Sequence, residues 1–232
     1  MDKSYASLNF ASRLNKAKKI EAVLRDFKKL ENLKILDIGC GSGVVSSFLG
    51  KISKYVWAVD VKDERIIKKG FKFKNVKDEK LPFKDDSFDI IISNFVIEHL
   101  NDKDMHIKEI KRVLKKEGIC YLSAPNKWAV FEPHYNLPFL SYLPKMLADY
   151  YVKLATNWTG EYDIKPLSFS EYCTLFRKNN FNIMNYTLKF AKHPEKYCIK
   201  PSFMLDIVKN IPYAILSKMN FIIPTYAFVL KK

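Results

Sequence analysis

Cysteine is scarce in this sequence, and long hydrophobic runs are absent from it. No two of the four cysteines have CxxC spacing, which excludes the common zinc-binding and thiol-redox motifs. No run approaches 18 apolar residues, and the first 19 residues contain no apolar stretch of signal-peptide length. These absences predict a reduced, cytoplasmic protein with no membrane-spanning helix.

Arginine is also scarce, although the protein is strongly basic. The net charge is +15, yet 35 of the 40 cationic side chains are lysines. Arginine, with its planar guanidinium group, is the usual specific reader of phosphates and bases. The composition therefore favours a solvated lysine surface. The alternative is a basic surface that faces an anionic lipid, a nucleotide-sugar or a nucleic acid.

Glycine and proline are divided unevenly along the chain. Six of the seven glycines precede residue 125, whereas nine of the ten prolines lie at or after it. Aromatic residues increase from 12 in the first 124 residues to 21 in the last 108. With 48% hydrophobic residues, this is the composition of a globular chain and not of a disordered one. We expect one domain over 1–232, with a regular core in 1–124 and an elaboration in 125–165 and 200–220.

Strand and helix patterns alternate through the first part. An apolar run such as Phe88–Ser93 is typical of a strand buried on both faces, and strands separated by helices imply a parallel sheet. The pattern predicts an α/β fold with a doubly wound, Rossmann-like sheet. The expected strands are 33–38, 55–61, 71–76, 88–93 and 118–124, and the expected helices are 12–31, 44–49, 62–69 and 104–115.

The second part has a different pattern. Residues 125–142 resemble a loop, and Pro144 can open a helix that ends near Leu154. Ser168 or Ser170 can cap a helix to about Asn179. Glu171 completes a capping box with Ser168. We expect strands over 181–189 and 221–230, and between them an amphipathic helix over 202–219 that Pro212 kinks.

A glycine-rich segment, LDIGCGSG at 36–43, follows the first expected strand. Its spacing is neither that of a P-loop nor that of the GxGxxG dinucleotide motif. Asp60 ends the second strand, where a carboxylate can accept hydrogen bonds from both ribose hydroxyls. Asp37, placed at the mouth of the loop, would repel phosphate and attract a cation. The segment therefore predicts a nucleoside site without phosphates.

Together these residues resemble a class I S-adenosylmethionine-dependent methyltransferase. The similarity extends from about Leu33 to Asn126, and it is nearest to the subgroup that includes the ubiquinone- and menaquinone-biosynthesis enzymes. The motifs that carry it are LDIGCGSG, VWAVD, LPFKDDSFDIIISNFVIEHL, EIKRVLKKEG and YLSAPN. The resemblance implies S-adenosylmethionine as cofactor. It also implies a mostly parallel seven-stranded sheet with an antiparallel last strand, and a helical, aromatic lid inserted after strand five.

The resemblance also implies roles for individual residues. Asp78 would contact the adenine amino group and Glu79 is the alternative, because Lys77 occupies the position where the family often has this acid. Asn94 would border the methyl group. The cofactor-binding residues implied are Asp37, Gly39, Cys40, Gly41, Gly43, Asp60, Val61, Asp78, Glu79 and Asn94.

Two histidines are candidates for catalysis. His134 lies in the segment that lines the acceptor pocket in this family, and His99 follows strand four. Either could accept a proton from a hydroxyl acceptor. His106 and His193 are expected at the surface. We expect no metal, because no ligand cluster is visible in the sequence.

The sequence indicates the methyl acceptor less precisely than the cofactor. The aromatic segment 125–165 suggests a small-molecule, glycan or lipid-linked acceptor that is methylated at oxygen. Helix 202–219 and the lysines allow peripheral contact with a membrane. An RNA-modifying methyltransferase and a catalytically silent cofactor-binding protein are the alternatives. The small number of arginines and the absence of an appended RNA-binding module argue against nucleic acid.

Overall fold

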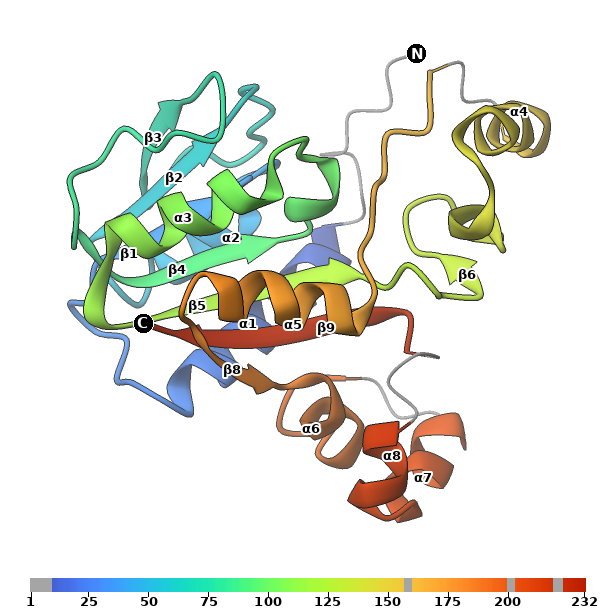
Figure 1. Ribbon diagram of the computed structural model, residues 1–232. Coiled ribbons are helices and arrows are strands. Elements are labelled where there is room, and N and C mark those ends of the chain that lie inside the picture. The colour runs from blue at the N-terminus through green and yellow to red at the C-terminus, as the bar shows by residue number, and fades with distance from the viewer. Residues whose placement is uncertain (1–9, 157–159, 200–202, 219–222) are drawn as a thin grey trace.

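A seven-stranded β-sheet forms the centre of the protein (Figure 1). The structure is a computed structural model and describes residues 10–156, 160–199, 203–218 and 223–232. The strand order is β3-β2-β1-β4-β5-β9-β8, and every neighbouring pair is parallel except those that β9 forms with β5 and β8. The strands are β1 (Ile35–Ile38), β2 (Val56–Asp60), β3 (Lys72–Asn75), β4 (Phe88–Asn94), β5 (Leu114–Pro125), β8 (Asn182–Asn185) and β9 (Thr225–Lys231). The expected sheet, with its antiparallel last strand, is confirmed.

Helices cover both faces of this sheet. Side chains alternate along β4, so that Ile90 and Ile92 enter one hydrophobic core and Ile91 enters the other. The core on the Ile91 side is completed by α3 (Lys103–Val113) and α5 (Phe169–Lys178). The opposite core is completed by α1 (Phe10–Arg25), α2 (Val44–Leu49) and α6 (Thr187–Lys192). The expected doubly wound arrangement is therefore confirmed.

The helix expected over 62–69 is wrong. The backbone N–H groups of Ile66 and Ile67 both donate to the carbonyl of Ser42, at 3.0 Å, so they are not available for a helical ladder. The ion pair between Asp63 and Arg65, with 2.7 Å between Oδ1 and Nε, holds the start of the segment. This stretch therefore packs as an irregular support under the glycine-rich segment.

The strand expected over 181–189 is correct only in its first half. β8 ends at Asn185, whose Oδ1 accepts a hydrogen bond of 2.9 Å from the N–H of Thr187. That side-chain bond turns the chain, and α6 begins at Thr187. The capping box predicted for α5 is present, with Ser168 as the N-cap and Glu171 as its partner.

The elaboration after β5 lies beyond the carboxyl ends of β4 and β5 (Figure 1). It contains a short hairpin of β6 (Phe131–Glu132) and β7 (Leu137–Pro138), a 3₁₀ turn η3 (Leu140–Tyr142) and α4 (Lys145–Ala155). Leu140, Ala148, Val152, Tyr162 and Ile164 form a separate small core there. The segment thus packs largely on itself.

The amphipathic segment near the carboxyl terminus is broken at Pro212, as expected, into α7 (Phe203–Asn210) and α8 (Tyr213–Lys218). These helices lie beside α6, away from α4 (Figure 1). The remainder of the predicted helix, residues 202 and 219, lies outside the described residues. Within the described ranges, no helix combines the length and the apolar character needed to cross a bilayer.

Candidate active site

The glycine-rich segment joins β1 to α2 through three left-handed backbone positions. Gly39 has φ +70°, and a Cβ there would lie 2.4 Å from a methyl carbon of Val96. Gly43 has φ +76°, and a Cβ there would lie 2.3 Å from the carbonyl oxygen of Ile67. Any larger residue would therefore clash as well as strain the backbone. The loop has the open backbone that close approach of a ligand requires.

Asp37 is buried beneath this loop, which corrects its expected place at the mouth. Its Oδ2 accepts a hydrogen bond of 2.5 Å from the hydroxyl of Ser46. Burial raises the pKa of Asp37 to about 7, the Ser46 bond opposes this rise, and the charge of Asp60 adds to it. Asp37 is thus held as a buried support of the loop, and its contact with a cofactor stays a prediction.

Asp60 ends β2 with both carboxylate oxygens bound to backbone. Oδ2 accepts from the N–H of Gly41 and Oδ1 from the N–H of Val61, each at 2.8 Å. The carboxylate is therefore fixed against the glycine loop. Val61, next in the chain, is exposed. This arrangement places an acid and an open apolar side chain where a nucleoside was expected.

The two candidate adenine contacts lie differently. Asp78 is exposed, and its Oδ1 accepts a hydrogen bond of 2.9 Å from the N–H of Lys80. Glu79 is half-buried. The assignment of Asp78 stays a prediction, since only a bound adenine distinguishes them. The glycine cradle together with the fixed carboxylate of Asp60 fits S-adenosylmethionine.

Asn94 ends β4, and its Oδ1 accepts a hydrogen bond of 2.6 Å from Ser123 at the end of β5. Asn94 and Phe95 border a cavity of about 290 Å³. Phe95 has φ +59°, a strained conformation for an aromatic residue. Most of the lining is apolar or aromatic, and it includes Ile20, Tyr121, Phe190, Ile199, Leu205 and Ile223. The cavity thus joins the predicted methyl end of the cofactor site to a large apolar wall.

Two lysines of α1 contribute the charge of this cavity. The Nζ of Lys16 lies 4.9 Å from the centre of the Phe95 ring, and that of Lys19 lies 5.3 Å from the centre of the Phe190 ring. Burial lowers the pKa of both, and neighbouring Arg13 and Lys19 lower that of Lys16 further. Across the ranges that the structure describes, neither ammonium forms an ion pair with a carboxylate. An anion is therefore the ligand that the lysines favour.

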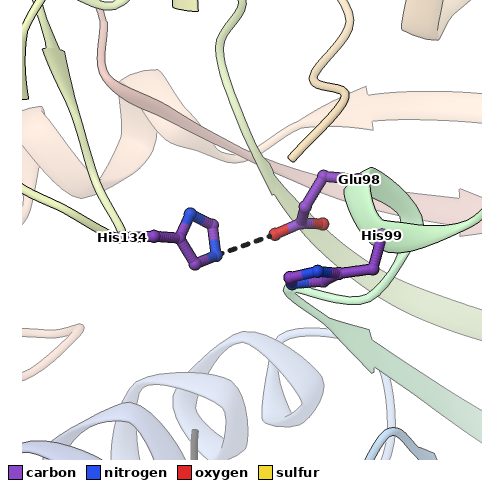
Figure 2. Close-up of side chains that lie close together, drawn as sticks. All are labelled: Glu98, His99 and His134. Atoms are coloured by element: carbon purple, nitrogen blue, oxygen red, sulfur yellow. Dashed lines mark ion pairs between the residues drawn. The ribbon is translucent and has the colours of Figure 1, made fainter. Parts of the chain in front are cut away.

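Beside Phe95, His134 faces a fully buried carboxylate. His134 lies in the turn of the β6–β7 hairpin, and its ring centre is 5.7 Å from that of Phe95. Its Nδ1 is 2.7 Å from Oε1 of Glu132, and its Nε2 is 3.5 Å from Oε1 of Glu98 (Figure 2). Burial lowers the pKa of His134, but the two carboxylates outweigh burial and raise it to about 9. The two carboxylates therefore favour the protonated form of the imidazole.

Glu98 and His99 come from η2 (Ile97–His99), the turn after β4. Neither carboxylate oxygen of Glu98 has a hydrogen-bond partner in the described part of the chain. The Nδ1 of His99 is 3.5 Å from Oδ2 of Asp163. One atom each from Glu98, His99 and His134 lies within 4.8 Å of the other two, a group able to hold a metal ion. The structure thus brings both predicted histidines together.

Sequence reasoning missed or misplaced several of these groups. Glu98 is not among the candidates that the sequence indicates, although an acid beside a histidine after a buried strand is a usable signal. Lys16 and Lys19 looked like ordinary members of a lysine-rich helix. His106, expected at the surface, is buried, with Nε2 3.0 Å from the hydroxyl of Ser93.

Comparisons with known proteins identify the family of the chain. Residues 36–122 match the family model described as a methyltransferase domain. The chain is 31% identical over 181 residues to the ubiquinone biosynthesis O-methyltransferase of Pelagibacter ubique, covering 70% of each protein. It is 29% identical over 147 residues to the demethylmenaquinone methyltransferase of Chlorobaculum tepidum, covering 60% of this chain and 59% of that one.

Solved structures agree on the fold. An S-adenosylmethionine-dependent methyltransferase from Mesorhizobium loti superposes with a TM-score of 0.62 at 15% identity. The superposition covers 94% of this chain and all of the other. At this level of identity the likeness extends to the fold alone.

Proposed function

Because the chain belongs to the class I S-adenosylmethionine-dependent methyltransferases, we propose that it methylates an oxygen of a small acceptor with an apolar body and an anionic group. The observation that carries the acceptor class is the cavity of about 290 Å³ bordered by Asn94 and Phe95. Its wall is mainly apolar, and its only charged lining residues among those described are Lys16 and Lys19. Two relatives, a ubiquinone biosynthesis O-methyltransferase and a demethylmenaquinone methyltransferase, support a quinone-type acceptor.

The protein's own residues have three tasks in this reaction. S-adenosylmethionine supplies a methyl group activated on a sulfonium. The glycine loop and Asp60 would hold the nucleoside and the methionine part, and Asn94 would border the methyl group. Phe95 lines the cavity, and its ring centre lies 5.7 Å from that of His134, so it would place the acceptor beside the Glu98–His134 pair. The acceptor oxygen must be held about 3 Å from the methyl carbon, because alignment supplies much of the rate.

An oxygen acceptor must lose a proton during transfer. The carboxylate of Glu98 accepts no hydrogen bond from any described residue. It can therefore take up the proton of a hydroxyl group on the acceptor. His134, charged and held by Glu132, would stabilise the negative charge that develops on the oxygen. This division of roles replaces the expectation that His134 or His99 accepts the proton.

Replacement of a cavity lysine tests whether the acceptor carries an anionic group. We expect methyl transfer to 3,4-dihydroxybenzoate, which combines a ring, hydroxyl groups and a carboxylate. Lys19→Met should raise KM for this acid by about tenfold, the scale of a charged hydrogen bond, and leave KM for catechol unchanged. Lys18→Met, one position away on the exposed side of α1, is the matched control. Equal effects on both acceptors would refute an anion site.

The roles of Glu98 and His134 are tested by measuring kcat. His134→Ala should lower kcat by about 10²–10⁴-fold, the usual range for acid–base groups, while the affinity for S-adenosylhomocysteine stays the same. His134→Gln keeps a polar group but not a charge, and it should recover only a small part of the loss. If His134→Ala turns over at the parent rate, the hairpin only covers the site.

A further inference from the structure

We propose that Arg112, acting through Glu109, positions the segment of the chain that contacts the adenine base of S-adenosylmethionine. Both residues lie on α3, which covers one face of the sheet (Figure 1). The segment is 76–81, which follows β3 and contains Asp78 and Glu79. The inference rests on the adenine contact expected of one of these acids, and it is independent of the methyl acceptor. Arg112 is thus a positioning residue, because it would act on the base only through the segment that it holds.

The ion pair between the two residues is the first observation. Arg112 binds Glu109 through two nitrogens of its guanidinium, with Nε on Oε1 and Nη2 on Oε2, each at 2.7 Å. Glu109 is buried, and the hydrogen bonds from Arg112 hold the pKa of its carboxyl below the usual range. Bidentate pairs of this kind fix geometry as well as charge. The carboxylate is therefore ionised and held in one orientation.

The pair closes on the backbone of Leu81 from both sides. Oε2 of Glu109 accepts from the N–H of Leu81 at 2.8 Å, and Nη2 of Arg112 donates to the carbonyl oxygen of Leu81 at 3.0 Å. Nη1 of Arg112 also donates to the carbonyl oxygen of Phe83, at 2.8 Å, and to Oδ1 of Asp85, at 2.7 Å. Both polar backbone groups of one buried residue are thus fixed by a single pair of side chains. We call Arg112 and Glu109 the Leu81 clamp.

The other end of the segment is attached to the ribose side of the expected cofactor site. The N–H of Val76 donates to the carbonyl oxygen of Asp60 at 2.9 Å, and the side-chain amide of Asn75 donates to the same oxygen at 3.1 Å. Residues 76–81 therefore run from the acid expected to bind ribose to the Leu81 clamp. A binding group keeps the geometry that it needs when the residues behind it are fixed. The two ends together determine how the candidate adenine acids are presented.

Loss of the clamp would release this segment without removing the rest of the site. The N–H and carbonyl groups of Leu81 would lose their charged partners, so the segment would no longer have one position. The glycine loop is held by other contacts, such as the hydrogen bond from the N–H of Gly41 to Asp60. We therefore expect the cofactor to bind still, but with less preference for adenine over another base.

That preference can be measured in calorimetry without any acceptor. S-inosylhomocysteine carries an oxygen where S-adenosylhomocysteine carries the adenine amino group, so a carboxylate fixed at this point repels it. The parent protein should bind S-adenosylhomocysteine at least about tenfold more tightly, the scale of a charged hydrogen bond. Arg112→Lys keeps the charge but loses the planar fork, and it should reduce the preference to about twofold. A parent that binds both compounds equally would overturn the inference and leave the proposed methyl transfer untouched.

Lys111→Met is the matched control. Lys111 is the neighbouring cation of α3, and its Nζ holds the carbonyl oxygens of Asn179 and Asn180, at 2.6 and 3.1 Å. Its replacement should lower the free energy of unfolding in urea, as Arg112→Lys does, yet keep the preference of the parent. If both replacements reduce the preference alike, Arg112 contributes to folding only, and the positioning role is refuted.

Two further measurements separate positioning from a general loss of binding. In an Asp78→Asn background, or in Glu79→Gln if that acid proves to be the contact, Arg112→Lys should cause no further loss of preference, because it acts through the same contact. In the otherwise unchanged protein, Arg112→Lys should raise KM for S-adenosylmethionine by about fivefold and leave kcat at saturation unchanged. Additive losses of preference, or a fall in kcat at constant KM, would overturn the inference. Failure to methylate 3,4-dihydroxybenzoate would refute only the proposed function, since the preference is measured without an acceptor.

Discussion

The two sides of the candidate active site are built differently. On the cofactor side, the carboxylates are bound within the protein: Asp37 by Ser46, and Asp60 by two backbone N–H groups. On the acceptor side, within the described residues, the Glu98 carboxylate accepts no hydrogen bond and pairs only with His134, at 3.5 Å, and Lys16 forms no ion pair. One side is complete in the free protein, whereas the other retains buried charges that a ligand would satisfy.

The difference follows from the elements that build each side. The glycine loop is fixed by the pairing of β1 with β2 and by its own backbone geometry. The acceptor side depends on side chains from α1, from η2 and from a hairpin of two short strands, which lie far apart in the sequence. A preformed cofactor site and a ligand-completed acceptor site are the consequence.

We expect low pH to have the largest effect, because it protonates buried His106. This residue contacts Ser93 in β4, a strand of the sheet that both sides share. Burial lowers the pKa of His106 from 6.5 to about 4. The unfolded chain therefore takes up this proton first, and stability that is complete above pH 6.5 is lost as the pH falls toward 4. At pH 4.5 the loss should be about 2.5 kcal/mol in the free energy of unfolding.

Urea denaturation at pH 7.5 and pH 4.5 measures this loss. His106→Gln should remove that part of the pH dependence, while His193→Gln at an exposed position should keep it. If both variants lose as much free energy of unfolding as the parent between pH 7.5 and pH 4.5, His106 does not determine the stability in acid. The two sides can then be compared at lower pH.

Asp60→Ala is the next largest perturbation, and it should affect the cofactor side alone. Loss of the carboxylate removes a charged hydrogen-bond acceptor, and S-adenosylhomocysteine should bind about 1.5–3 kcal/mol more weakly in calorimetry. The KM for 3,4-dihydroxybenzoate, measured at saturating S-adenosylmethionine, should be unchanged. A parallel loss on both sides would show that they fold as one unit and would break the comparison.

The adenine contact gives a smaller effect. Asp78→Asn should weaken S-adenosylhomocysteine binding by about 1 kcal/mol, since a neutral acceptor replaces an ionised one. Glu79→Gln, the adjacent half-buried acid, is the matched control and should change little. The reverse pattern in calorimetry would assign adenine to Glu79.

The same contrast explains what the sequence could predict. The succession of strands along the chain depends on a local signal, the apolar periodicity. The glycine loop depends on another, glycines at positions that need a positive φ. Such signals predicted β4 and the Ser168 capping box. They failed for 62–69, where the backbone hydrogen bonds go to Ser42, far back in the chain.

The acceptor side could not be predicted in this way. His134 was a candidate from its segment, but its partner Glu98 lies 36 positions earlier and belongs to another element. Lys16 and Lys18 look alike in the sequence, yet only Lys16 lines the cavity. Which of two equivalent residues turns inward depends on the register of α1 against the sheet, and the sequence alone does not give that register at single-residue precision.

The smallest expected effect concerns membranes, and it would extend the comparison to the outer surface. The exposed apolar side chains Met146, Tyr150 and Leu154 lie at helical spacing on α4, and Ile215 is exposed on α8. An acceptor with an apolar body would be met most readily at a lipid surface. We expect weak binding to anionic vesicles in low salt, with release as salt rises, because the lysine contribution is screened. Sedimentation with vesicles measures it. Leu154→Ser should weaken binding more than Ile215→Ser if α4 is the contacting element, since its apolar face is the larger. No association at any ionic strength would mean that the acceptor reaches the lysine-lined cavity from water, and that the apolar residues of α4 serve another contact.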